Sequence, residues 1–261
     1  MYFIFLMVSL LASTVGAICG IGGGVIIKPS LDAIGVMGVS SINFLSGCTV
    51  LSMAMISVYK TMKRDTSTVD LKTGTPLAIG SAVGGVLGKE IFQYAYVILP
   101  NEDRLGAIQA IILTIITIGT LIYTINDSKI KTHQVNNIIA CIFIGLMLGL
   151  ISAFLGIGGG PINLVVLGYF FSMDTKLAAA NSLYIILLSQ FTSLVSTIIK
   201  GNVPDFSLIV LLLMVIGGVS GGMIGSKISK RISSTQVNKL FIGLMIIIIF
   251  INIYNTVMFS R

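Results

Sequence analysis

The sequence predicts an all-α polytopic membrane protein, and three observations support this fold class. Hydrophobic residues make up 55% and charged residues 10% of the 261 residues, whereas a soluble domain usually has about 25% charged residues. The apolar residues form long continuous runs rather than alternating with polar ones, which favours helices over barrel strands. Two glycine-rich motifs also occur twice at nearly constant spacing, which indicates an internal duplication.

Ten apolar runs are expected to form the helices, and most reach the roughly 17–25 residues that a spanning helix needs. In chain order they are Tyr2–Cys19, Val25–Val39, Ile42–Tyr59, Gly74–Leu99, Leu105–Ile125, Ile138–Leu155, Pro161–Phe171, Leu177–Ile199, Phe206–Ile224 and Leu240–Met258. The first run contains no Lys or Arg and belongs to the duplication, so we interpret it as a helix rather than a signal peptide.

The duplication is visible in three motifs. "CGIGGG" at Cys19–Gly24 returns as "LGIGGG" at Leu155–Gly160, an offset of 136. The glycine-rich run Gly80–Lys89 returns at Gly217–Lys227 with an offset of 137, and Asn43 matches Asn181 at 138. We therefore expect one transmembrane domain made of two repeats, residues 1–126 and 135–261.

The positions of the basic residues favour inverted halves. Suppose that each glycine motif is the tip of a helical hairpin, followed by three further crossings. One side of the membrane then holds 11 of the 16 Lys and Arg residues, as the positive-inside rule expects of the cytoplasmic side. With the motifs inside full crossings, the two sides are nearly equal. We expect two inverted-topology repeats, each a glycine-tipped broken-helix hairpin plus three transmembrane helices, with both termini outside.

Inverted repeats with broken helices are typical of secondary transporters, whose substrate sites lie near the midplane between the repeats. We call Gly20–Gly24 and Gly156–Gly160 the two glycine knots. Free N–H groups and the positive helix starts at such tips suit an anion, although close helix packing is the alternative. The glycines of the third helix of each half are interpreted as a packing surface: Gly80, Gly84, Gly85 and Gly88, with Gly217, Gly221, Gly222 and Gly225.

The expected substrate-binding residues come from both halves. They are Gly22, Gly23, Gly24, Lys28, Asn43, Gly158, Gly159, Gly160, Asn181 and Ser182. The amides and hydroxyls in this set are neutral donors suited to an oxyanion, but they equally suit hydrogen bonds between helices.

Lys28 is a charge within an apolar run, which is by default a functional hypothesis. It either attracts an anion, or snorkels to the interface and steadies the hairpin with Asp32. Leu164 occupies the aligned position in the second half, so either role is asymmetric. Pro29 is expected to start the second limb of the first hairpin.

No catalytic residue, metal site or cofactor is expected, and the chain is not interpreted as an enzyme. The core runs carry no carboxylate pair, and the spacing of Cys19, Cys48 and Cys141 fits no metal site. The net charge of +7 comes from connecting loops and does not indicate nucleic acid. A proton as the coupling ion and a homodimer as the assembly are left open.

These motifs resemble those of the TauE/SafE family of sulfite exporters and related permeases, over the whole chain. The resemblance depends on the doubled "GxGGG", on Pro29 after the first copy, on "AANSL" at Ala179–Leu183, and on the glycine-rich third helices. It implies a multi-pass transporter of the bacterial inner (cell) membrane that moves small anions, such as sulfite, other sulfur oxyanions or organosulfonates. An anion channel of the same architecture and a non-transporting membrane scaffold are the alternatives.

Two departures from the family pattern concern the expected site. Pro161 follows the second knot directly instead of at the usual spacing. In the first half, Asn43–Phe44–Leu45 stands where the family has a threonine, a serine and a leucine, so the serine hydroxyl is interpreted as missing there.

Overall fold

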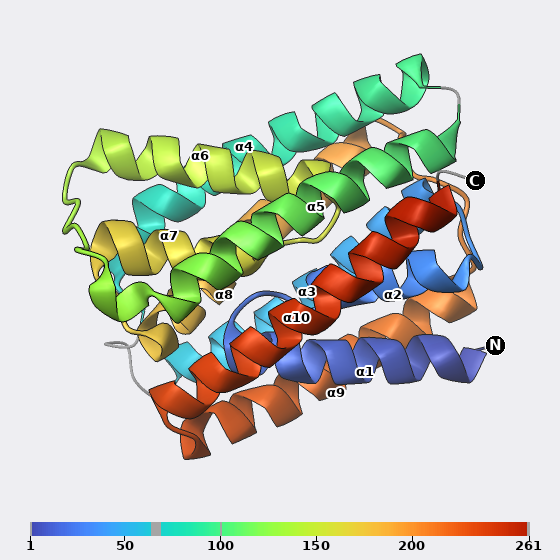
Figure 1. Ribbon diagram of the computed structural model, residues 1–261. Coiled ribbons are helices and arrows are strands. Elements are labelled where there is room, and N and C mark those ends of the chain that lie inside the picture. The colour runs from blue at the N-terminus through green and yellow to red at the C-terminus, as the bar shows by residue number, and fades with distance from the viewer. Residues whose placement is uncertain (1, 64–68, 100, 260–261) are drawn as a thin grey trace.

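The computed structural model describes residues 2–63, 69–99 and 101–259, and within these ranges the chain forms ten α-helices and no strand. The helices are α1 Tyr2–Cys19, α2 Gly24–Ile34, α3 Val39–Met62, α4 Leu71–Ile98, α5 Glu102–Ile125, α6 Ile138–Phe154, α7 Pro161–Phe171, α8 Thr175–Ile199, α9 Leu208–Arg231 and α10 Ser234–Phe259 (Figure 1). The all-α prediction is confirmed, with one helix for each apolar run.

Helix ends differ from the predicted ends where local backbone chemistry decides them. α2 ends at Ile34, before the predicted Val39, because Gly35 adopts φ +66° and its N–H donates to the carbonyls of Leu31 and Asp32. The expectation that Pro29 starts the second limb is wrong, since α2 begins at Gly24 and contains Pro29. Pro29 lies beyond the first turn of α2, where a proline removes one backbone hydrogen bond of the helix.

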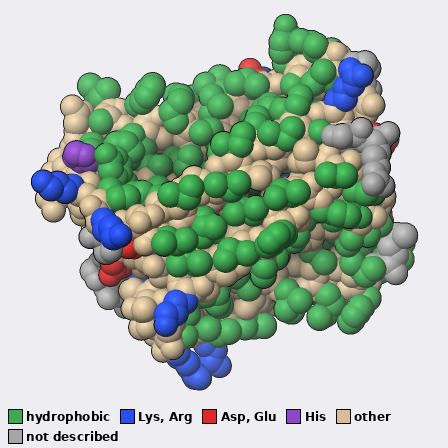
Figure 2. Space-filling view, viewed as in Figure 1, with side chains coloured by type: hydrophobic (Ala, Val, Ile, Leu, Met, Phe, Trp, Pro, Cys, Tyr) green, Lys and Arg blue, Asp and Glu red, His purple; other side chains and the backbone are tan. Residues whose placement is uncertain are grey.

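The surface is that of a membrane protein. Six helices are long and apolar enough to cross a membrane by length and composition: α1, α3, α5, α8, α9 and α10. Figure 2 shows hydrophobic side chains over the middle of the visible face, and most of its Lys and Arg at one end. The polytopic part of the fold prediction is therefore confirmed.

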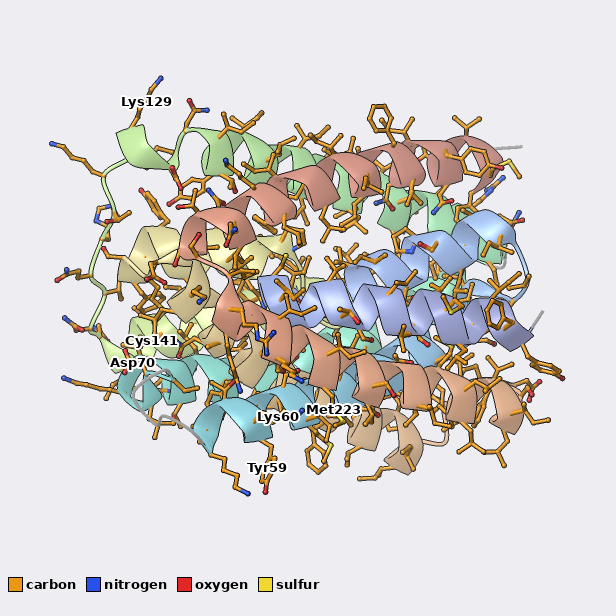
Figure 3. All side chains as sticks on the ribbon, turned by 90° about the horizontal axis from the view of Figure 1, so that it is seen from below. Tyr59, Lys60, Asp70, Lys129, Cys141 and Met223 are labelled. Atoms are coloured by element: carbon orange, nitrogen blue, oxygen red, sulfur yellow. The ribbon has the colours of Figure 1, made fainter. Side chains whose placement is uncertain are left out.

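The two ends of the bundle differ. Both chain termini lie at the right-hand end of Figure 1, which we call the terminus end. The connections α5–α6, α7–α8 and α9–α10 lie at the opposite end, which we call the basic end. Figure 3 shows Asp70 and Lys129 both at this basic end, at opposite sides of the bundle. The chain therefore carries its basic loops away from its termini.

Two helix pairs of the same kind join the halves, α4 with α6 and α1 with α9. At both, a Cβ atom added to the helix glycines would overlap atoms of the neighbouring helix, which are backbone atoms at all of these glycines except Gly217, where the Ser9 hydroxyl is closest. Gly80, Gly84 and Gly88 lie against α6, and Gly217, Gly221 and Gly225 against α1. These glycines therefore allow close backbone approach, as the packing interpretation expects.

Corresponding helices of the two halves run in opposite directions where they meet. Gly47, early in α3, contacts Gln190, late in α8, and the later part of α3 packs with Leu183 and Ile186, earlier in α8. An inverted repeat requires this antiparallel course, although the duplication itself stays a prediction. The largest buried apolar cluster, which includes Ile21 and Ile157, surrounds the two knots.

Candidate substrate site

The glycine knots are the turns at which the chain reverses between α1 and α2 and between α6 and α7. Gly22 has φ +75° and Gly158 has φ +67°, in the left-handed region that side chains rarely adopt. Gly20, Gly156 and Gly159 also have positive φ angles. Glycine at these positions is therefore required by the backbone, and not only by close packing.

The two knots touch each other at the centre of the bundle. A Cβ atom added at Gly24 would overlap the carbonyl oxygen of Ile157, and one added at Gly22 would lie 3.5 Å from that of Gly158. Across the same contact, the carbonyl oxygen of Ile21 lies 3.3 Å from a Cβ added at Gly159. All residues of both knots are buried. The structure thus brings together the six expected glycines of the site.

Two helix starts also meet at this point. α2 follows Gly23 and α7 follows Gly160, and neither N-cap residue has a side chain that could cap the helix. The first N–H groups of a helix lack partners within the helix and carry partial positive charge. Pro161, at the first position of α7, contributes no N–H, so the second knot has one donor fewer. The carbonyl oxygens of Ile157 and Ile21 also lie at this contact. The knots therefore present both hydrogen-bond donors and acceptors.

Neutral side chains surround the knots, and several of their polar atoms have no partner among the described residues. The Asn43 amide lies against Gly156, and both its oxygen and its nitrogen are buried and unpaired. The Ser46 hydroxyl lies 3.0 Å from a Cβ added at Gly24, and it is also unpaired. A buried polar atom without a hydrogen bond is costly, so these atoms are candidates for ligand contact.

Ser13 belongs to the same group, although the sequence did not single it out. Its hydroxyl is buried, unpaired, and 3.1 Å from a Cβ added at Gly23. The sequence feature that could have identified Ser13 is its position as a polar residue within the apolar run Tyr2–Cys19, where a hydroxyl needs a partner.

Asn181 and Ser182 have other partners. The Asn181 side-chain oxygen accepts a hydrogen bond from the N–H of Asp70 at 3.0 Å, and its nitrogen donates to the carbonyl of Leu177 at 2.9 Å. Asn181 therefore joins α8 to the start of α4. The Ser182 hydroxyl accepts a hydrogen bond from the Asn163 amide at 3.2 Å, which links α8 to the first turn of α7. Asn163, like Ser13, was missed.

The contacts also correct the alignment of the two halves. Gly156 contacts Asn43, and Gly20 contacts Ala179. From 43 to 179 is 136 residues, the offset of the knots themselves, so the spatial counterpart of Asn43 is Ala179 and not Asn181. At the same offset, Ser46 corresponds to Ser182. The interpretation that the first half lacks this serine is therefore wrong.

Lys28 forms a buried ion pair with Asp32, one helical turn further along α2. The Lys28 ammonium lies 2.6 Å from the carboxylate, and each side chain is 4% exposed. Lys28 faces Gln109 of α5 and Asn252 of α10, and Asn255 donates to the carbonyl of Pro29 at 2.9 Å. Of its two predicted roles, the geometry favours the pairing with Asp32 that steadies the hairpin. The expectation that Lys28 snorkels to the interface is wrong, because its side chain is buried.

The described residues contain no group of three or more His, Cys, Asp or Glu side chains that could hold a metal ion. The polar groups that lie at the knots are glycine backbone, the side-chain amides of Asn43 and Gln190, and the hydroxyls of Ser13 and Ser46, all of them uncharged. Such uncharged groups can bind a small ion reversibly through hydrogen bonds.

The fold and the central knots define a multi-pass membrane protein built on two broken helices. The model of the family "Sulfite exporter TauE/SafE" matches residues 5–251. The chain belongs to this family of membrane transporters, and the resemblance seen in its motifs is confirmed.

A curated relative is named "Probable membrane transporter protein YunE" and comes from Bacillus subtilis (strain 168). It is 27% identical over 228 residues, which cover 77% of this chain and 80% of the relative. No solved structure matches the chain.

Proposed function

We propose that this protein is a secondary transporter of small anions, with sulfur oxyanions or organosulfonates such as sulfite as its substrates. The substrate is held between the two glycine knots, and access alternates between the two repeats. The observation that carries this proposal is the meeting of two uncapped helix starts beside the unpaired Asn43 amide.

The chemistry at the knots suits an anion better than a cation. Helix starts favour negative charge, and the polar side chains closest to the knots supply amide and hydroxyl donors instead of carboxylates. The buried carboxylate of Asp32 lies further along α2 and already has Lys28 as its partner. The substrate class is proposed from the name of the family, sulfite exporter, and from these neutral donors, which match the oxygens of a small oxyanion.

Alternating access is proposed because the knots are closed to both ends of the bundle. All ten knot residues, Gly20–Gly24 and Gly156–Gly160, are buried, so an anion reaches them only if helices move apart. The glycine-lined contacts α4–α6 and α1–α9 each join one half to the other. Small residues leave such surfaces without interlocking side chains, which permits one half to rock against the other.

The topology of the proposal follows from charge. With residues 1–126 and 135–261 as inverted repeats, the basic end faces the cytoplasm of a bacterial cell and both termini face outward. A proton gradient is the proposed driving force. A homodimer stays a prediction, for which the described contacts within one chain offer no test.

Purified protein in liposomes tests the function. Sulfite, sulfate, thiosulfate, sulfoacetate and small carboxylates are supplied in turn, with and without a pH gradient. Saturable uptake of a sulfur anion that responds to the gradient is the expected result. Flux that does not saturate would favour the channel alternative, and no flux of any of these anions would favour the scaffold.

A further inference from the structure

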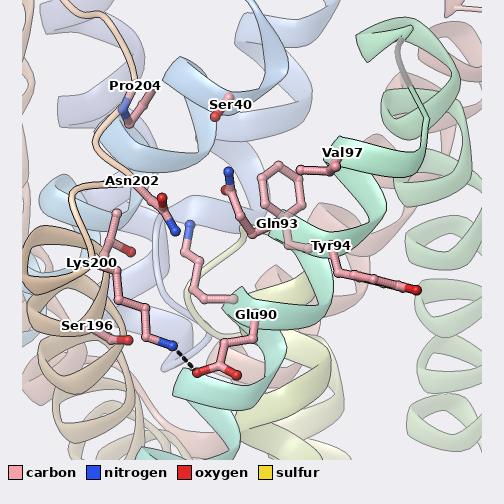
Figure 4. A pocket seen from close by; sticks show the side chains of 12 residues that line it. Ser40, Glu90, Gln93, Tyr94, Val97, Ser196, Lys200, Asn202 and Pro204 are labelled. Atoms are coloured by element: carbon pink, nitrogen blue, oxygen red, sulfur yellow. Dashed lines mark hydrogen bonds and ion pairs between the residues drawn. The ribbon is translucent and has the colours of Figure 1, made fainter.

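A cavity of about 300 Å³ opens at the terminus end of the bundle, away from the knots. Its walls are the later part of α4, the end of α8, the start of α3 and the segment that follows Lys200 (Figure 4). Lys89, Glu90 and Gln93 line it from α4, Ser196 from α8, and Lys200 and Asn202 from the segment beyond. Neither the family description nor the proposed central site accounts for this cavity.

The charges that line the cavity leave one positive charge uncompensated. Lys200 is paired with Glu90, a pair that Figure 4 marks with a dashed line. Lys89 is half-buried, and its ammonium has no ion-pair partner among the described residues and lies 5.6 Å from the centre of the Phe92 ring. An ammonium without an ion-pair partner is energetically costly on a helix of a membrane bundle. An anion that binds beside Lys89 would compensate this charge while it is bound.

Neutral hydrogen-bond donors accompany this charge. Figure 4 shows the Gln93 and Asn202 side chains approaching each other from opposite walls of the cavity, with Ser196 below them. Amide and hydroxyl groups donate to oxyanions without carrying charge. One ammonium with several neutral donors therefore suits a small oxyanion of low charge.

A second cavity at the basic end has the opposite character. It measures about 500 Å³, and Asp127 and Asp174 are among its lining residues, which include no Lys or Arg. Two uncompensated carboxylates repel an anion. Of the two cavities, only the one at the terminus end is suited to attract the proposed substrate.

A polar face of α8 runs from this cavity towards the knots. Ser196 is followed inward by Ser193 and then by Gln190 and Ser189, at the three- and four-residue spacing that places side chains on one helical face. The hydroxyls of Ser193 and Ser189 are buried and have no partner among the described residues. Gln190 is 4% exposed, and its side-chain carbon lies 3.1 Å from a Cβ added at Gly158. Gln190 therefore packs directly against the second knot.

We propose that the cavity lined by Lys89 is a docking site for the transported oxyanion at the terminus end, and that the polar face of α8 leads from it to the knots. This inference rests on the proposed function. Lys89 supplies the attraction, Gln93 and Asn202 supply hydrogen bonds, and the anion advances when Gln190 moves away from Gly158.

Uptake of sulfite is measured in vesicles of known orientation for the wild type, Lys89→Met and Lys89→Arg. Losing a charged hydrogen-bonding partner is expected to raise the KM of Lys89→Met by roughly ten- to a hundredfold. The increase is expected only for anion supplied at the terminus end, and Lys89→Arg is expected to stay within a few-fold of the wild type. A structural role of Lys89 would instead change uptake equally from both sides.

Two further variants use the neighbouring ion pair. Lys200→Met leaves Glu90 uncompensated beside the anion, so its KM is also expected to rise at the terminus end. The double variant Lys200→Met with Glu90→Gln restores the charge balance and is expected to resemble the wild type. Lys129→Met, at the basic end, is the matched control for loss of one positive charge.

An unchanged KM in Lys89→Met, measured while the wild type transports sulfite, would overturn the docking site and leave the proposed function standing. Absence of transport by the wild type for every anion tested would overturn both.

Discussion

Asn43 offers the sharpest test of the site because stability and transport are expected to change in opposite directions. Its amide is buried with both polar atoms unpaired, and burying such a group costs about 1–3 kcal/mol on the scale of protein mutations. Asn43→Leu replaces the amide with an apolar group of similar shape. The free energy of unfolding is therefore expected to stay constant or to rise by up to this amount.

Transport is expected to suffer in the same variant. A hydrogen bond to a charged ligand contributes about 1.5–3 kcal/mol, which corresponds to a roughly 10- to 150-fold higher KM for the anion. The assays are thermal unfolding in detergent and anion uptake by liposomes. Asn181→Leu is the comparison, because Asn181 is hydrogen bonded to Asp70 and Leu177. It is expected to lose about 1–3 kcal/mol of stability with little change in KM.

A less stable Asn43→Leu protein with an unchanged KM would refute this reasoning. Asn43 would then be an ordinary contact between α3 and the second knot.

Three further predictions concern the knots, the ion pair and the topology. Gly24→Ala forces a Cβ atom against the Ile157 carbonyl, and it is expected to cost about 1–3 kcal/mol and to impair uptake. Gly119→Ala has open space and is expected to be neutral or slightly stabilising; equal behaviour of the two in unfolding and uptake assays would contradict the knot contact. Lys28→Met or Asp32→Leu alone is expected to destabilise by about 3–5 kcal/mol, whereas the double variant Lys28→Met with Asp32→Leu recovers most of the loss; a thermal double-mutant cycle of these variants without coupling would contradict the pairing. Reporter fusions are expected to locate both termini outside the cytoplasm, and a cytoplasmic N-terminus would refute the inverted topology.

The helices were predictable because long apolar runs leave few alternatives in a membrane. α1 and α7 match their predicted runs, Tyr2–Cys19 and Pro161–Phe171, at both ends. The end of α2 was not predictable with the same accuracy, because it depends on the left-handed cap at Gly35. Such a cap depends on the backbone conformation of a single residue, which the hydropathy of the sequence does not predict.

The site was predictable in outline and not in detail. The doubled motif indicated that the knots would be equivalent, and the structure places them in contact. The match of Asn43 with Asn181 was misleading. The two residues are identical, but their offset of 138 differs by two from the offset of 136 that the knots and their contacts require. Lys28 and Asp32 stand four residues apart, so their pairing on one helical face was among the expected alternatives. No sequence pattern, however, indicated that Lys28 would lie beside Gln109 of α5 and Asn252 of α10.

The central claim is that the transported anion lies between the knots. Ser46→Cys places a thiol beside Gly24, in a background where Cys19, Cys48 and Cys141 are replaced by alanine. The measurement is the rate at which N-ethylmaleimide modifies this thiol, with and without a saturating concentration of the transported anion. Strong protection by the anion is the predicted result. An unchanged rate, in protein that still transports the anion, would contradict the claim.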